Sequence, residues 1–251
     1  MSGHSHWAGI KHKKALIDAK RGKHWSRLSK AIIVAAKIGG GDPDMNPRLR
    51  VAIDAAKAVS MPKDNIQRAV KRGTGEIGGG SLDEILYEGY GPGGVAVLCE
   101  VLTDNRNRTA PEIRKVFEIS DGKLGAAGCV AWMFEKKGLF LIPAGQADED
   151  KLMEIALEAG ADDVRPSGDK FEIVCPPEVH EAVSKALAQA GIQPDVSEVS
   201  RLPKNTIDVS DPDTARKVLK LMNRLDDHDD VQNVSSNFNI AEEIMAQVGE
   251  E

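Results

Sequence analysis

The residue types most able to do chemistry in this chain are its cysteines and one dense run of carboxylates. Cys99, Cys129 and Cys175 lie in apolar segments and form no C-x-x-C pair. Nothing beside them would lower the pKa of a thiol, so we expect them to be small core residues. The run DDHDD at 226–230 falls between an expected helix and an expected strand, which favours a solvated turn. No nucleophile is paired with a base, so we expect a protein that is not an enzyme. An enzyme with its site in an α/β cleft is the alternative.

Histidine and glycine patterns could indicate a metal or a cofactor. His4, His6, His12 and His24 are close in the sequence, but their spacing matches no common zinc site. The pattern G-x-G-x-x-G occurs twice, after an expected helix ending near residue 73 and again before an expected strand starting near residue 94. A dinucleotide fingerprint needs a strand before it and a helix after it. We therefore expect no metal, no cofactor and no small-molecule substrate.

The charge of the chain is divided unevenly along its length. The chain as a whole has a formal net charge of −6. Residues 1–72 nevertheless carry ten lysines and six arginines against five aspartates and no glutamate, a net charge of +11, which leaves −17 for the remainder. The stretch GHSHWAGIKHKKALIDAKRGKHW at 3–25 contains six of these cations and one carboxylate, Asp18. Such a division predicts separate modules with different partners.

The basic segment reads as a helical bundle over residues 1–75. A helix at 23–38 would place Lys23, Arg27, Lys30 and Lys37 on one stripe and Trp25 among apolar residues on the opposite side. Asn46 followed by Pro47 predicts the start of another helix. A short helix after Pro62 would end at Gly73, and a first helix is expected at 7–20.

The simplest interpretation of a stripe of like charge is a helix face that is exposed to solvent. Here, however, the positive charge extends over several helices, and we expect it to be largely unpaired. Unpaired like charges repel one another unless a polyanion neutralises them, and phosphate backbone is the commonest such partner. Acidic membrane lipid is the rival, but no strongly apolar face is left to insert. The residues expected to contact nucleic acid are Lys11, Lys13, Lys14, Lys20, Arg21, Lys23, Arg27, Lys30, Lys37, Arg48, Arg50, Arg68, Lys71 and Arg72, with Arg106 and Arg108 beyond the bundle. Charge reversal at Lys23, Arg27 and Lys30 is expected to weaken binding without unfolding the chain, because these groups should be exposed.

The acidic remainder alternates short strands with helices and predicts an α+β multidomain fold. Residues 136–203 read as βαββαβ, the ferredoxin-like order. The flanking segments, 80–135 and 204–240, read as two further βαβ halves, with strands at 94–102, 129–134, 206–209 and 231–238. We therefore expect two ferredoxin-like sandwiches after the bundle, one inserted in the other, with YEGYGPGG as a turn entering the first strand.

The motif TDNRNRT at 103–109 joins an expected strand to an expected helix. Thr109 and Glu112 would form a capping box, which would place Arg106 and Arg108 at a helix start, where anions bind. The alternative is that both arginines pair with local carboxylates such as Glu88 or Glu112. No secretory signal and no long apolar run is present, which predicts a cytoplasmic protein, and an organelle transit peptide is the minor alternative.

Several motifs together resemble the YebC/PmpR family, which includes mitochondrial translational activators. They are GHSHWAGIKHKKALIDAKRGK, GGGDPDMNPRLR, YEGYGPGGVAV, TDNRNRT and LGAAGCVAWMFEKKG. The resemblance is dense up to about residue 138 and looser to about residue 238. It implies a helical N-terminal domain, two α/β domains of which one is inserted in the other, and a non-enzymatic role in gene expression. It supplies no catalytic residue.

Two regulatory functions fit this resemblance. The first is a transcriptional regulator that binds DNA through the basic bundle. The second is a translation factor that binds ribosomal or transfer RNA on the ribosome and assists elongation through difficult proline-containing stretches. Both require phosphate recognition, so the charge pattern does not separate them.

Overall fold

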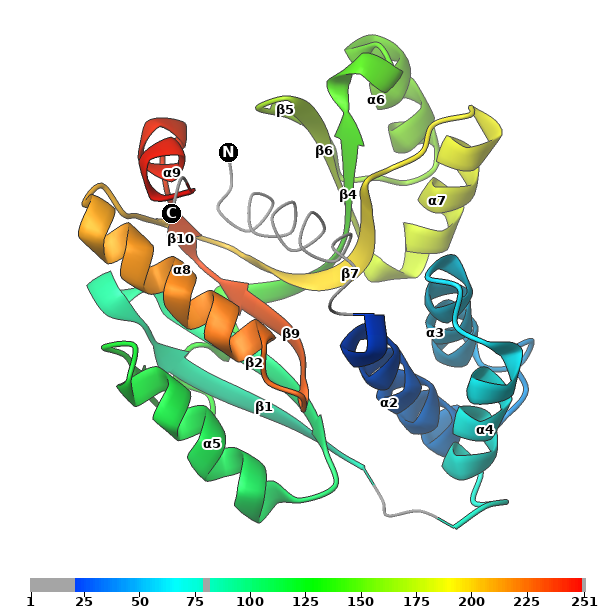
Figure 1. The fold of residues 1–251 in the computed structure, drawn as a ribbon. Helices are drawn as coiled ribbons and strands as arrows, with labels where there is room; N and C mark the ends of the chain where they lie inside the picture. Colours follow the sequence, from blue (N-terminus) through cyan, green and yellow to red (C-terminus); the bar gives the residue numbers. More distant parts are fainter. Residues whose placement is uncertain (1–20, 79–81, 250–251) are drawn as a thin grey trace.

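The computed structural model describes residues 21–78 and 82–249. A helical bundle is followed by two α+β sandwiches, and the second sandwich is inserted into the first (Figure 1). This arrangement confirms the predicted fold class. The helix expected at 7–20, with Lys11, Lys13, Lys14 and Lys20, lies outside the described residues.

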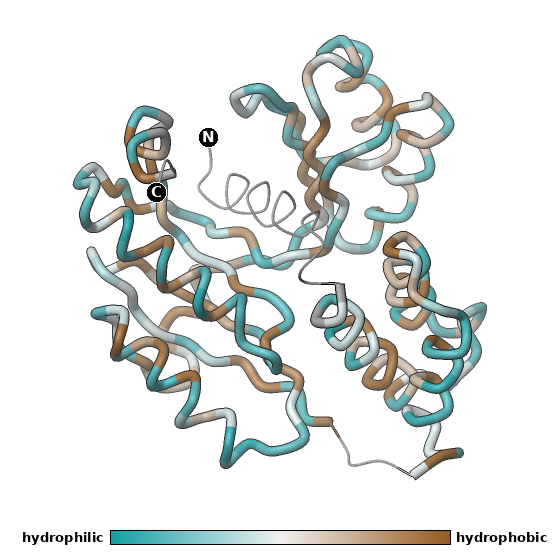
Figure 2. Tube along the Cα trace, viewed as in Figure 1, coloured by the Kyte–Doolittle hydropathy of each residue, from teal (hydrophilic) through white to brown (hydrophobic). Residues whose placement is uncertain are grey.

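The bundle is held together by apolar faces that its helices turn toward one another (Figure 2). Its described helices are α2 (Arg21–Gly39), α3 (Pro47–Ala58) and α4 (Lys63–Gly73). Ile32, Leu49 and Ala56 are fully buried between them. Trp25 packs against this core and donates from Nε1 to the carbonyl of Val59 at 3.2 Å. Trp25 is therefore a structural residue, as its place on the apolar stripe predicted.

Asn46 fixes the turn between α2 and α3. Its Oδ1 accepts from the backbone N–H of Leu49 at 3.1 Å, which caps α3 as the sequence predicted. Its Nδ2 donates to the carbonyls of Ala35 at 2.8 Å and Gly40 at 2.9 Å. One buried side chain therefore makes hydrogen bonds to free backbone groups at the end of one helix and at the beginning of the next.

Replacing Asn46 by alanine is expected to lower the free energy of unfolding by about 2 kcal/mol. Loss of an N-cap costs about 1 kcal/mol, and the carbonyls left without a donor add to that cost. Met45→Ala is the matched control, because the Met45 side chain is exposed and should contribute little. Urea denaturation of the two variants checks this, and equal midpoints would contradict it.

The first sandwich contains a four-stranded antiparallel sheet with the order β3-β1-β2-β9. Helices α5 and α8 cover one face of this sheet (Figure 1). Its elements are β1 (Asp83–Tyr90), β2 (Ala96–Thr103), α5 (Arg106–Glu118), β3 (Lys123–Leu124), α8 (Pro212–Asp226) and β9 (Val231–Ser236).

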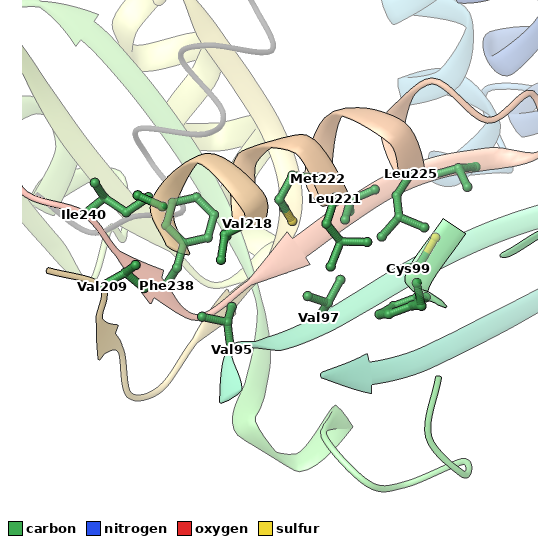
Figure 3. Close-up of a cluster of buried hydrophobic side chains, with 14 of the residues drawn as sticks. Val95, Val97, Cys99, Val209, Val218, Leu221, Met222, Leu225, Phe238 and Ile240 are labelled. Atoms are coloured by element: carbon green, nitrogen blue, oxygen red, sulfur yellow. The ribbon is translucent and has the colours of Figure 1, made fainter. Parts of the chain in front are cut away.

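The core of the first sandwich lies between this sheet and its helices. Alternate residues of β2, such as Val97 and Cys99, point toward α8, which contributes Leu221 and Leu225 (Figure 3). Cys99 is fully buried, and this burial raises the pKa of its thiol far above the usual value. Cys99 is a core residue, as predicted from its apolar surroundings.

One predicted strand of the first sandwich is wrong, and another is present but lies outside the four-stranded sheet. Residues 129–133 form a bend and a 3₁₀ helix (Ala131–Met133) rather than a strand, because they fold over the sheet instead of joining it, and Phe134 begins the next strand. Residues 206–209 supply β8 (Ile207–Asp208), which pairs in parallel with β10 (Phe238–Asn239) outside the four-stranded sheet. Strand β1 was not expected from the sequence, and its last residues are the first residues of YEGYGPGG. A C-terminal helix, α9 (Glu242–Gly249), packs on α8.

The inserted sandwich follows the predicted ferredoxin-like order closely. Its antiparallel sheet has the order β5-β6-β4-β7, with α6 and α7 on one face. Its elements are β4 (Phe134–Pro143), α6 (Glu149–Glu158), β5 (Asp163–Ser167), β6 (Lys170–Cys175), α7 (His180–Gln189) and β7 (Val196–Pro203). The limits 1–75, 80–135 with 204–240, and 136–203 remain our proposal for the domains of the chain, which this topology supports.

Candidate nucleic-acid interface

The basic stripe of α2 does not face solvent along its whole length. Arg27 pairs with Asp226 at the end of α8, with 3.1 Å between Nη1 and Oδ1. Lys30 pairs with Asp230 at 2.6 Å and donates to the carbonyl of Asp229 at 3.1 Å. Only 13% and 19% of the Arg27 and Lys30 side chains are exposed. The expectation that both are exposed and unpaired is therefore wrong, because they join the bundle to the first sandwich.

Asp230 is the centre of this joint. Its buried carboxylate accepts from Lys30, from Arg108 at 2.8 Å and from the hydroxyl of Thr109 at 2.7 Å. The hydroxyl of Thr103 lies 3.2 Å from the same carboxylate. Burial acts to raise the pKa of Asp230, but these hydrogen bonds and the positive charge of Lys30 hold it far below its usual value.

The expectation of a solvated turn at 226–230 is wrong for both ends of the run. At the first end, Asp226 is the last residue of α8 and pairs with Arg27. Asp227 and Asp229 are exposed, but Asp230 is buried in the joint. His228 lies between them and contacts Glu112 of α5 at 3.1 Å. An open depression of about 840 Å³ lies beside these residues and Arg108. Its lining carries both signs of charge, so it does not resemble a phosphate site.

The cations of α3 also have carboxylate partners. Arg48 pairs with Glu84 of β1, and Arg50 pairs with Glu181 of α7 at 3.2 Å. Lys57 pairs with Asp54 on its own helix at 3.1 Å. These pairs are largely exposed, so each contributes little to stability, and a phosphate could replace the carboxylate at small cost.

Arg106 and Arg108 both pair with carboxylates, which was the alternative to an anion site at the start of the helix. Helix α5 begins at Arg106, capped by Asn105, whose side chain accepts from the N–H of Arg108 at 3.1 Å. The predicted capping box of Thr109 is therefore wrong, because Thr109 is buried one turn further along. Arg106 pairs with Asp83 at 2.7 Å, and Arg108 pairs with Asp230.

The outer side of α4 carries three exposed cations in the part of the bundle that the structure describes. Lys63, Arg68 and Lys71 are exposed, and within the described residues none of them makes an ion pair. We call these three residues the α4 basic face. Arg68 and Lys71 were expected from the sequence, but Lys63 was not, although helical spacing places it on the same side of the helix as Lys71.

Four other predicted cations of the bundle remain. Two of them contact the protein in part, and the side chains of the other two are not described by the structure. Lys37 is exposed at the end of α2 and lies 3.5 Å from the carbonyl of Leu82. Arg72 is half-buried, and its Nε has no hydrogen-bond partner within the described residues. Arg21 and Lys23 lie on α2, but their side chains are outside the described part of the structure.

Among the residues that the structure describes, no cluster of three or more His, Cys, Asp or Glu side chains could hold a metal ion. Burial raises the pKa of the thiols of Cys129 and Cys175, in the latter case to about 11. Neither thiol is therefore activated as a nucleophile. Within residues 21–78 and 82–249, no helix combines the length and the apolar character needed to cross a membrane.

Comparisons with known proteins match nearly the whole chain. A family model described as the TACO1/YebC protein N-terminal domain matches residues 5–76, and one described as the TACO1/YebC second and third domain matches residues 82–238. A probable transcriptional regulatory protein of Rhodopirellula baltica is 56% identical over 248 residues, which cover 98% of this chain and 100% of the relative. A second probable transcriptional regulatory protein, from Desulfotalea psychrophila, is 57% identical over 250 residues, which cover 100% of this chain and 100% of the relative. The crystal structure of a conserved hypothetical protein of Aquifex aeolicus superposes with a TM-score of 0.86 at 48% identity, covering 96% of this chain and 99% of that one.

Proposed function

Because the chain belongs to the TACO1/YebC family, we propose that it is a non-enzymatic regulator of transcription that binds DNA through its basic helical bundle. The names of its relatives support the regulatory role. The α4 basic face supports binding by the bundle, because it presents three cations to solvent without a carboxylate partner in the described residues. We place this action in the cytoplasm.

The contact we propose is mainly to phosphates. Lysine and arginine on the α4 basic face would neutralise backbone charge and release counterions, which gives affinity without reading bases. Gln67 is the exposed neutral residue between these cations. Arg48, Arg50 and Lys57 of α3 would join the contact by exchanging an exposed carboxylate for a phosphate. Arg27 and Lys30 would not take part, because they are used in the joint with the first sandwich.

Crosslinking in cells, followed by sequencing of the recovered DNA and RNA, tests the proposal. We expect DNA fragments enriched around promoters, in amounts that fall when the α4 basic face is replaced by alanine. Recovery of ribosomal or transfer RNA without enriched DNA would contradict a role in transcription. That result would favour the translation factor that the sequence left open.

A further inference from the structure

The face of the first sheet opposite α5 and α8 carries a rigid loop. Residues 125–134 fold over this face, where Val130 and Phe134 pack on Ala96 and Leu98. The loop is close to the sheet at its start, where the N–H of Gly125 donates to the carbonyl of Glu88 at 2.7 Å. A side chain on Gly125 would also collide with Sγ of Cys129 within the loop. Gly128 adopts a φ of +85°, which favours glycine. The path of this loop is therefore set by its packing and its glycines.

A buried carboxylate holds the loop in place. Glu88 of β1 accepts from the backbone N–H groups of Gly128 at 2.6 Å, Val130 at 2.8 Å and Ala131 at 2.7 Å. Burial acts to raise the pKa of Glu88, but these three hydrogen bonds lower it below its usual value. Glu88 therefore stays charged and keeps the loop fixed near neutral pH.

Two aromatic rings are exposed to solvent at this loop: Trp132 belongs to the loop, and Tyr90 is the last residue of β1. Trp132 is 64% exposed and Tyr90 is 39% exposed, although both are large side chains that are usually buried. The Nε1 of Trp132 and the hydroxyl of Tyr90 both donate to the carbonyl of Cys129, each at 3.2 Å. One acceptor therefore orients both rings, and neither ring is needed by the core.

A lysine lies beside the aromatic pair. Lys123 is the direct cross-strand partner of Tyr90 in the antiparallel pairing of β1 and β3, so their side chains share this face. Lys123 is exposed and forms no ion pair within the described residues. Proteins bind unpaired nucleotides with exposed aromatic rings next to a cation. The rings stack on the bases, and the cation interacts with a phosphate.

We propose that Trp132, Tyr90 and Lys123 form a second nucleic-acid site, which binds single-stranded nucleic acid by base stacking. Trp132 is the main stacking platform, Tyr90 extends it, and Lys123 contacts the backbone. Glu88 is a positioning residue, because it acts only through the loop. The site goes beyond the phosphate contact proposed for the bundle, since it selects unpaired bases rather than a duplex.

Fluorescence anisotropy with a labelled, unstructured ten-nucleotide RNA tests this site on the full chain. We expect Trp132→Ala to weaken binding about tenfold and Trp132→Phe to restore most of the affinity, because a ring is retained. Leu157→Ala is the matched control, because it removes another exposed apolar side chain, on α6, and should leave the affinity unchanged. We also expect the RNA to quench tryptophan fluorescence in the wild type and much less in Trp132→Phe.

The same variants on a DNA duplex separate this inference from the proposed function. Trp132→Ala should bind a duplex as the wild type does. Equal RNA affinity for the wild type, Trp132→Ala and Leu157→Ala would overturn the inference and would point to a protein contact at Trp132. A wild type that binds the RNA in a Trp132-dependent way but does not bind duplex DNA would overturn the bundle proposal alone.

Discussion

Replacing Asp230 by alanine is expected to lower the free energy of unfolding by about 3 kcal/mol and to loosen the bundle from the first sandwich. The change removes the acceptor shared by Lys30, Arg108 and Thr109. Removing one partner of a buried ion pair costs about 3–5 kcal/mol, because the other charge is left buried. The lower value is expected here because the Arg108 side chain is 46% exposed and can turn to water. Chemical denaturation measures the change.

Asp229→Ala is the matched control for this prediction. It removes the same charge from the same turn but from an exposed side chain, so we expect a change of about 0.5 kcal/mol or less. A double-mutant cycle with Lys30→Met should give a coupling of about 1–3 kcal/mol for the Lys30–Asp230 pair. Equal stability of Asp230→Ala and Asp229→Ala would show that the joint does not hold the bundle.

The stability that Asp230 contributes should depend on pH. The pKa of Asp230 is lower in the folded chain than in the unfolded chain, where it is about 3.9. The folded state therefore gains stability above the unfolded pKa and loses it as pH falls below about 4. Asp230→Asn should lack this part of the acid transition, which a comparison of denaturation midpoints at pH 7 and pH 3 would detect.

Replacing the α4 basic face by alanine is expected to weaken DNA binding on the order of 10²-fold at about 0.1 M salt. Each neutralised phosphate contributes about 0.9 to the slope of log affinity against log salt, so three contacts supply a large share of non-specific affinity. The fold should persist, because Lys63, Arg68 and Lys71 are exposed and alanine favours helices. Anisotropy with a labelled duplex measures the loss.

The matched control for the α4 basic face changes the same charge elsewhere. Arg114, Lys151 and Lys220 are exposed cations of the two sandwiches. Replacing all three by alanine alters the net charge of the chain equally but leaves the bundle intact. We expect the affinity of this control to stay close to that of the wild type. A loss as large as that of the α4 variant would mean that net charge, and not the α4 basic face, controls binding.

The parts of the fold that sequence predicted well have local causes. The start of α3 follows from Asn46 and Pro47, and the end of α4 follows from Gly73. The strands and helices of the inserted sandwich are each bounded by turn residues and show their own periodicity. Strand β1 was missed because its polar residues and Gly89 resemble a turn, although its pairing with β2 is long and regular.

The parts that sequence could not predict depend on partners far apart in the chain. Arg27 and Lys30 are separated from Asp226 and Asp230 by 199 and 200 residues, so their pairing is invisible in any local pattern. The sequence pattern of a basic stripe is the same whether its cations bind a phosphate or pair with a carboxylate of another domain. The cations of α4 differ from those of α2 only in what the fold brings next to them.

The salt dependence of duplex binding is the most direct test of our central claim, that the α4 basic face neutralises phosphates. Affinities of the wild type, the α4 variant and the charge-matched control would be measured for one duplex across a series of salt concentrations. We expect the plot of log affinity against log salt to be shallower by about 3 for the α4 variant and unchanged for the control. Parallel plots for all three proteins would contradict the claim.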